Sequence, residues 1–107
     1  MIIVTTDNLP GREISEALGL VQGTSVRASH VASDVGSFMQ NLVGGEIDQY
    51  TKLMAEVREQ SLDRLREEAK AKGADAVVGL RFVSSEIAIG AAEMIAYGTA
   101  VRLTTRS

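Results

Sequence analysis

The chain has 107 residues and a net charge of −3, and its length is that of one domain with one hydrophobic core. Hydrophobic residues make up 45% of it, which excludes a disordered chain, and no run reaches the ~18 apolar residues that span a bilayer. The negative charge argues against nucleic acid, and the absence of cysteine excludes zinc–thiolate sites and is typical of the cytoplasm. We therefore expect one cytoplasmic domain over residues 1–107 that binds neither nucleic acid nor membranes.

The first part of the sequence predicts a short strand, a turn and a longer strand. Residues 2–5 are β-branched, and residues 7–11, Asp-Asn-Leu-Pro-Gly, have the composition of a firm turn. Residues 12–28 predict a strand with a bulge or kink near Gly19 and Gly23. The start of this segment also fits two turns of a helix, and the sequence alone leaves that alternative open.

Two helices follow in the predicted order. Residues 29–45 predict the first, because the apolar residues recur at spacings of four, three and four and two glycines end the segment. Residues 46–72 predict a longer second helix, with acids at its start, lysines at its end and Gly73 to stop it. At about 1.5 Å per residue this helix is about 40 Å long. We expect one end of it to project from the domain or to pack on another chain.

The last part of the sequence predicts a β-hairpin. Residues 74–83 read as a strand, residues 84–90 as the reversal and residues 92–103 as the partner strand. Alternation gives the last strand one bulky face and one face of small residues. We expect a helix to cover the bulky face and a second copy of the chain to cover the small one, with a narrow ligand slot as the alternative. The residues of this predicted interface are Met94, Ala96, Gly98 and Ala100.

Two carboxylates flank the predicted reversal of the hairpin. If Glu86 and Glu93 meet there, they form a pair suited to acid–base chemistry or to a hard cation. The alternative is a solvated loop acid and a glutamate that pairs with Arg27, Arg81 or Arg102. The sequence favours this structural alternative, because one pair of acids makes no complete site.

The lone histidine offers a second candidate site. His30 and Asp34 are four residues apart, so on a helix they share a face, as a metal-binding or proton-transfer pair does. The structural alternative is that His30 only caps the helix or pairs with Asp34. Glu46 opens the second predicted helix after two glycines. The candidate ligands for a divalent metal, the one cofactor considered, are His30, Asp34, Glu46, Glu86 and Glu93.

Several runs together resemble the YbjQ-like family of small proteins labelled "putative heavy-metal-binding". They are IIVTT, LPGREI, VGGEIDQYTKLMAEVREQSLDRLREEAKAKGADAVVGLRF and EIAIGAAEMIAYGTAV, and the resemblance covers nearly the whole chain. It implies an α/β (α+β) fold like the dodecin subunit, with a small, mostly antiparallel sheet packed with two helices. It also implies that the chain partners itself in a ring, as a homopentamer.

Three functions fit these observations. The expected one is a non-enzymatic oligomeric binding or scaffold protein with its ligand at a subunit interface or central opening, because the sequence holds no catalytic motif. The second is a divalent-metal-binding protein that uses histidine and carboxylates, which suit hard or borderline cations better than soft ones. The third is a hydrolase-like enzyme that uses the same acids.

Overall fold

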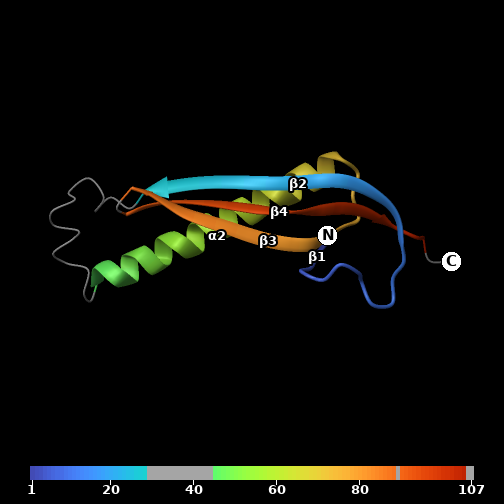
Figure 1. Ribbon diagram of the computed structural model, residues 1–107, viewed down its shortest axis with the longest axis horizontal. Helices are drawn as coiled ribbons and strands as arrows, with labels where there is room; N and C mark the ends of the chain where they lie inside the picture. The colour runs from blue at the N-terminus through green and yellow to red at the C-terminus, as the bar shows by residue number, and fades with distance from the viewer. Residues whose placement is uncertain (29–44, 89, 106–107) are drawn as a thin grey trace.

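The computed structural model describes residues 1–28, 45–88 and 90–105, so the first predicted helix lies outside the described residues. The described part is a four-stranded sheet with one long helix, an α+β fold (Figure 1). Its elements are β1 (Ile2–Ile3), β2 (Ile14–Ala28), α2 (Gly45–Ala71), β3 (Ala76–Ala88) and β4 (Ala91–Leu103). The strand order is β1-β3-β4-β2, with β1 parallel to β3 and the other pairs antiparallel. The predicted, mostly antiparallel sheet is confirmed.

β2 is a strand over its whole length, so the helical alternative for its start is wrong. Its pairing with β4 shifts register between Ala17 and Gly19, and Gly19 has a φ of +104° that other residues rarely adopt. This irregularity is the predicted bulge. The register then runs without a break through Gly23, so no second interruption exists there. Gly23 serves a different purpose, the close approach of α2.

β3 and β4 form the predicted hairpin, but β3 is longer than expected. It continues to Ala88, so residues 84–88 are strand and not part of the reversal. β4 pairs with four of these five residues, and a register shift between Glu86 and Ala88 leaves Ile87 outside the described ladder. Near the middle of β3 a bulge between Val78 and Arg81 contains Gly79, which has a φ of +65°.

α2 begins and ends within one residue of its predicted bounds. Its C-terminus is a Schellman motif, in which the Gly73 N–H donates to the Lys70 carbonyl at 2.9 Å and the Ala74 N–H to the Ala69 carbonyl at 3.0 Å. Gly73 takes the left-handed conformation that this motif requires, with a φ of +77°. Among the described residues, no helix combines the length and the apolar character needed to cross a bilayer.

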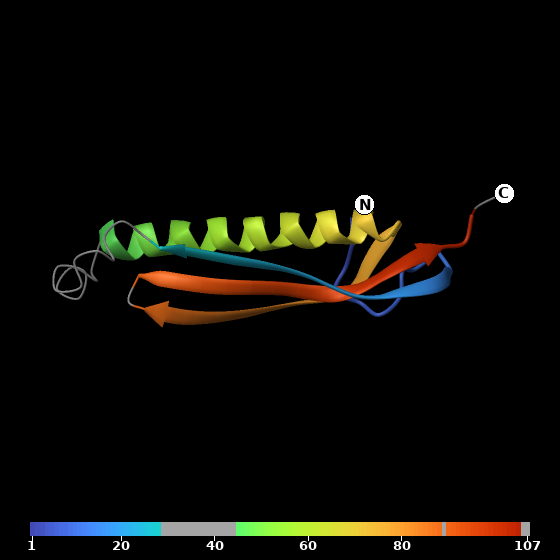
Figure 2. The ribbon, with the colours of Figure 1, turned by 90° about the horizontal axis from the view of Figure 1, so that it is seen from above.

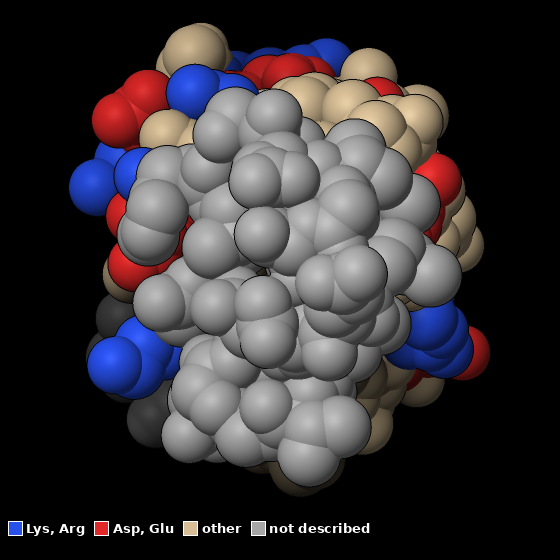
Figure 3. Space-filling model, turned by 90° about the vertical axis from the view of Figure 1, so that its left-hand side faces the viewer, with Lys and Arg blue, Asp and Glu red and all other residues tan. Residues whose placement is uncertain are grey.

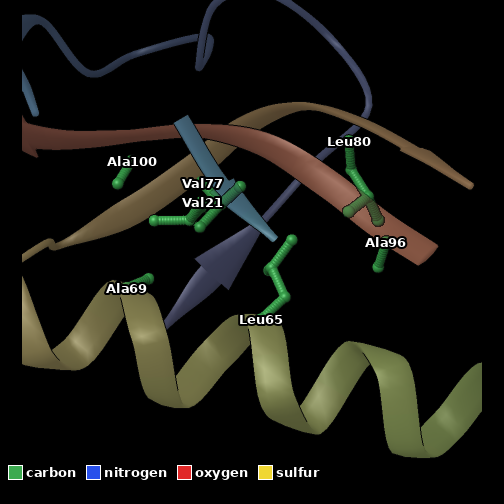
Figure 4. Close-up of a cluster of buried hydrophobic side chains, with 7 residues drawn as sticks. All are labelled: Val21, Leu65, Ala69, Val77, Leu80, Ala96 and Ala100. Carbon is green, nitrogen blue, oxygen red and sulfur yellow. The ribbon is translucent and has the colours of Figure 1, made fainter. Parts of the chain in front are cut away.

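α2 packs across β2 and β4 on the face that carries the small residues of β4 (Figure 2). The prediction that a helix covers the bulky face is therefore wrong. The main core cluster lies between helix and sheet (Figure 4), and it consists of Val21, Leu65, Ala69, Val77, Leu80, Ala96 and Ala100. A Cβ added to Gly23 would lie within 3.0 Å of the Ser61 carbonyl oxygen and the Leu65 nitrogen. Small sheet residues thus let the helix backbone approach, and the leucines of the helix fill the space.

The four residues predicted as a subunit interface, Met94, Ala96, Gly98 and Ala100, are therefore buried within one chain. A second copy cannot reach them while α2 is in place, which removes the reason for expecting the interface there. Within the described residues, the opposite face is covered near one end, where Leu9 packs on Ala76, Val78, Val101 and Leu103. The segment that carries Leu9 lies beside that end of the sheet in Figure 2.

Candidate functional site

The rest of the second sheet face has no covering element among the described residues. We call it the open face. The register places on it the even residues from Leu20 to Val26, the odd residues from Arg81 to Ser85 and the odd residues from Glu93 to Thr99. Three neighbouring strands, β2, β4 and β3, thus contribute one continuous surface.

The open face consists of rows of side chains that lie level with one another across the strands. Gln22, Tyr97 and Arg81 form one row, Thr24, Ile95 and Val83 the next, and Val26, Glu93 and Ser85 the third. Three large aliphatic side chains on this face are more than half exposed, namely Leu20 at 62%, Val26 at 51% and Val83 at 52%. Apolar side chains grouped in this way on a polar-rimmed surface mark an interaction site.

The two charged groups of the open face are held differently. The Arg81 Nη1 donates to the Thr5 carbonyl at 2.9 Å and to the Leu80 carbonyl at 2.8 Å, so its guanidinium is directed toward the N-terminal segment. The half-buried Glu93 carboxylate accepts a hydrogen bond of 3.4 Å from the Ser85 hydroxyl. This bond is long, which leaves the carboxylate oxygens available to a ligand or a neighbouring subunit.

The structure separates the two predicted paired carboxylates. Ser85 is opposite Glu93 in the ladder, and Glu86, the next residue, is opposite Ala92. Because successive side chains of a strand point to opposite faces, Glu93 lies on the open face and Glu86 on the helix side. The prediction that the two acids meet is therefore wrong, since both belong to strands and not to a shared reversal.

The arginines suggested as partners of these acids have other partners. Arg27 forms an ion pair of 3.1 Å with Glu56 of α2, and Arg102 lies 3.8 Å from Glu16. Both pairs are about half exposed, so they contribute little to stability. Arg81, as described above, binds backbone carbonyls.

Glu86 lies near the first half of α2. Burial of the Tyr50 phenol and the negative charge of Glu86 together raise the pKa of Tyr50 above its ordinary value of 10.0. The exposed Glu86 carboxylate on the helix side of the sheet thus acts electrostatically on the Tyr50 phenol of α2.

The side chains of the other three predicted ligands lie outside the part of the chain that the structure describes. His30 and Asp34 lie outside the described residues, and Glu46 belongs to the first turn of α2, where the structure describes only the backbone. In residues 1–28, 50–88 and 90–105, no three His, Cys, Asp or Glu side chains are grouped to hold a metal ion. The metal prediction thus has no preformed site within this part of one chain.

The functional residues that the sequence reasoning missed are Gln22 and Tyr97 of the open face. They were missed because a helix was expected to cover the bulky face of β4. A usable signal was present in β2, where Gln22 and Thr24 alternate with the buried Val21, Gly23 and Ser25. That alternation indicates a strand with one buried and one exposed face.

Charged side chains of both signs surround the end of the molecule seen in Figure 3. In that view the described Lys and Arg residues alternate with Asp and Glu residues around the rim. A nucleic-acid-binding face would show a continuous basic patch. The described part of this surface shows mixed charge instead.

Comparison with known proteins identifies relatives along almost the whole chain. The YbjQ family model, described as "Putative heavy-metal-binding", matches residues 1–104. A UPF0145 protein of Archaeoglobus fulgidus is 52% identical over 103 residues, which are 96% of this chain and 95% of that protein. A UPF0145 protein of Methanosarcina acetivorans is 45% identical over 106 residues, 99% of this chain and all of that protein. Neither of these relatives is named as an enzyme.

A solved structure confirms the fold independently. The crystal structure of a protein of unknown function from Pediococcus pentosaceus, assigned to the DUF74 family, superposes with a TM-score of 0.60. The match covers 97% of this chain and 98% of that one at 19% identity, so it supports the fold alone. The family match and the relatives at about half identity establish that the chain belongs to the YbjQ (UPF0145) family.

Proposed function

We propose that this protein is a non-enzymatic binding or scaffold protein that works as a cytoplasmic homo-oligomer. The observation that carries the proposal is the open face, where more than half of the Leu20, Val26 and Val83 side chains is exposed next to the half-buried Ile95 and Tyr97. Such a face is an interaction surface, covered by a ligand or by further subunits. The proposed number of subunits is five, as the family resemblance implies.

The dimensions of a single chain support assembly. The radius of gyration is 17.5 Å, and the extents are 60 × 22 × 16 Å. A compact domain of this length has a radius of gyration of about 13 Å. The accessible surface of 6447 Å² likewise exceeds the ~5,800 Å² expected of a compact monomer of this mass. A two-layer slab of these proportions leaves much of its sheet exposed, and association with other copies buries that surface.

Native mass spectrometry of the untagged protein tests this proposal. A bare pentamer supports a scaffold whose subunits cover one another, and a pentamer with a retained small molecule supports a binding protein. A monomer over a range of micromolar concentrations contradicts the proposal. A variant with Val83→Lys places a charge in the open face without touching the core, so we expect it to weaken a subunit contact made there.

Divalent-metal binding is the second candidate function, and the family description favours it. In a ring, each copy would contribute one Glu93, and a set of carboxylates from several copies would suit a hard or borderline cation. A thermal-shift series with magnesium, manganese, cobalt and zinc tests this, because a metal that binds only the folded state raises the melting temperature. The shift should disappear in Glu93→Gln and persist in Glu59→Gln, a control on the exposed side of α2. No shift with any of the four ions contradicts this candidate.

A further inference from the structure

We infer that copies of this chain join edge to edge, with the outer edge of β2 in one copy pairing in parallel with the outer edge of β3 in the next. This rests on the homo-oligomer proposed above and specifies its contact. β2 and β3 lie toward opposite borders of the sheet, with β4 between them (Figure 1). Among the described residues, β2 pairs only with β4, and β3 beyond Arg81 also pairs only with β4. The described part of each copy therefore carries two unpaired edges.

The central segments of the two edges contain no residue that keeps exposed strands from pairing. Soluble proteins protect such edges with charges, prolines or covering elements. Residues 20–26 of β2, LVQGTSV, and residues 82–85 of β3, FVSS, contain no charged residue and no proline. Five large apolar side chains of these two strands are exposed, namely Leu20, Val26, Phe82, Val83 and Ile87. The two edges have the composition of strands that are paired in the assembled protein.

The two edges match in direction and overlap along their length. β2 and β3 are each antiparallel to β4, so they run in the same direction, and copies that keep α2 on one face of a shared sheet pair in parallel. β1 and the bond from the Leu80 N–H to the Val4 carbonyl close the edge of β3 at one end. The bulge at Gly19 ends the regular part of β2 three rungs farther along the sheet, because Gly19 is opposite Ala100 whereas Arg81, beyond which the edge of β3 is open, is opposite Tyr97. The open edge of β3 is therefore level with the part of β2 that begins at Gly23.

Opposite charges also match across this contact. Arg27 of β2 and Glu86 of β3 are both level with Ala92 of β4 and lie on the helix side of the sheet. In a sheet continued in register, Arg27 of one copy is beside Glu86 of the next, and opposite charges on adjacent strands stabilise their pairing. Arg27 already contacts Glu56 through Nη1, but a guanidinium has five N–H donors and can bind a second carboxylate.

The alternative contacts use the two edges less completely. Two β2 edges, or two β3 edges, can pair around a twofold axis, but either arrangement leaves the other edge of each copy unpaired. Pairing β2 with β3 uses both edges of every copy, and such a head-to-tail contact closes into a ring when the rotation between copies allows it. The Thr24 carbonyl on β2 accepts a hydrogen bond from Arg64 of α2, and its second lone pair stays available to a neighbour.

Disulfide cross-linking tests the contact, because the natural chain has no cysteine. We expect the double variant Arg27→Cys/Glu86→Cys, after oxidation, to give a ladder of covalent oligomers on a denaturing gel without reductant. Within one chain, β4 separates the two positions, so they are about two strand spacings, ~10 Å, apart. That exceeds the ~7 Å between Cα atoms that a disulfide spans. The single variants should remain monomeric on the same gel.

A second double variant allows for stagger between the copies. Arg27→Cys/Ser84→Cys reports a contact shifted by two residues, which keeps every side chain on its face. A ladder from either double variant supports the inference. Two results overturn the inferred contact and leave the proposed function intact. One is a covalent dimer from Arg27→Cys alone. The other is the absence of a cross-link in both double variants while native mass spectrometry shows the wild-type chain to be oligomeric. A monomeric wild-type chain overturns both the contact and the proposed function.

Charge exchange gives a measurement without cysteines. Arg27→Glu should weaken association in dilution experiments by up to about fivefold per contact, and Arg27→Glu/Glu86→Arg should restore it. Glu56→Gln is the matched control, because it removes the contact of Arg27 within the chain and leaves the contact between copies. An oligomer fraction that falls equally in Glu56→Gln and Arg27→Glu overturns the inference.

Discussion

Gly23 sets the distance between α2 and the sheet, and Gly23→Ala tests that close approach. The added Cβ would lie within 3.0 Å of two backbone atoms, the Ser61 oxygen and the Leu65 nitrogen, and 2.9 Å from the Arg64 Cβ. Backbone atoms cannot rotate away as a side chain can. The helix must therefore move outward by about 1 Å, and a gap of that size removes a quarter to a half of the dispersion energy of the contacts around Leu65.

The expected loss of stability follows from this displacement. Overpacking of a well-packed core lowers the free energy of unfolding by about 1–3 kcal/mol, and a clash with backbone belongs at the upper end. Replacing glycine also restricts the unfolded chain, which offsets about 0.4–1 kcal/mol. We expect a net loss of about 2 kcal/mol, equivalent to a fall in melting temperature of about 10 °C for a domain of this size.

Urea unfolding followed by far-ultraviolet circular dichroism measures this loss, since α2 dominates the signal. Variants must be compared at one protein concentration, because association of the folded chain adds to its apparent stability. Glu67→Ala is the control, an exposed residue of α2 outside the proposed subunit contact, whose replacement should change stability by less than about 0.5 kcal/mol. Gly23→Ala should not be rescued by Arg64→Ala, because the closest contacts are to backbone. A loss below about 0.5 kcal/mol would refute the close packing of α2 on β2.

Three further outcomes follow from the same packing. In Gly98→Ala, the new Cβ would lie 2.7 Å from a methyl group of Val77, so the substitution should destabilise the fold and Val77→Ala should restore part of the lost stability. A double-mutant cycle measured by urea unfolding should give a coupling energy of about 1 kcal/mol between the two positions. Ser25→Ala removes the hydrogen bond that the buried hydroxyl donates to an amide of α2, so urea unfolding should show a loss of about 1 kcal/mol. Glu86→Gln removes a negative charge near the Tyr50 phenol, so an absorbance titration should show the pKa of Tyr50 falling toward 10.0 while burial keeps it higher. Because folding raises the pKa of Tyr50, the neutral phenol contributes fully to stability below pH 10.0, and this contribution is lost as the pH rises through the folded pKa. A wild-type titration curve without a raised tyrosine pKa would contradict this prediction.

Local patterns were sufficient to predict most of the elements. The apolar period near 3.6 and the glycine after the last turn gave the bounds of α2 to within one residue, because both signals act within the segment itself. The turn residues and alternation gave the hairpin of β3 and β4. These features need no knowledge of distant contacts, so the sequence carries them directly.

The face of the sheet that α2 covers was beyond such local patterns. Alternation in β4 divides its residues into a bulky and a small set, but both sets can be buried by a helix. The choice depends on Gly23 in β2, which is brought beside Ala96 only by the long-range pairing of the two strands. The position of Gly23 between polar residues of β2 acquires its meaning only after that pairing is known.

The misplaced carboxylates have a related cause. Glu86 was assigned to a reversal that was predicted to begin at the two serines before it. Pairing with β4 extends β3 past Glu86. Ser85 is the residue opposite Glu93, so Glu86, one residue later, points to the other face of the sheet. An error of a few residues in the end of one strand therefore changed the predicted chemistry of the whole site.

The pairing of β2 with β4 has a consequence for how the chain folds as it is made. Ile14 is opposite Leu103 and Ala28 is opposite Ala91, so every rung of this ladder closes a loop longer than half the chain. Contacts of such long range form slowly. At a synthesis rate of about 5–20 residues per second, β2 waits about 3–20 s for its partner strand to be made. During that interval the uncharged residues 20–26 of β2 are exposed to other nascent chains. Chains made by neighbouring ribosomes on one message can therefore exchange β2, so that β2 of one copy pairs with β4 of another.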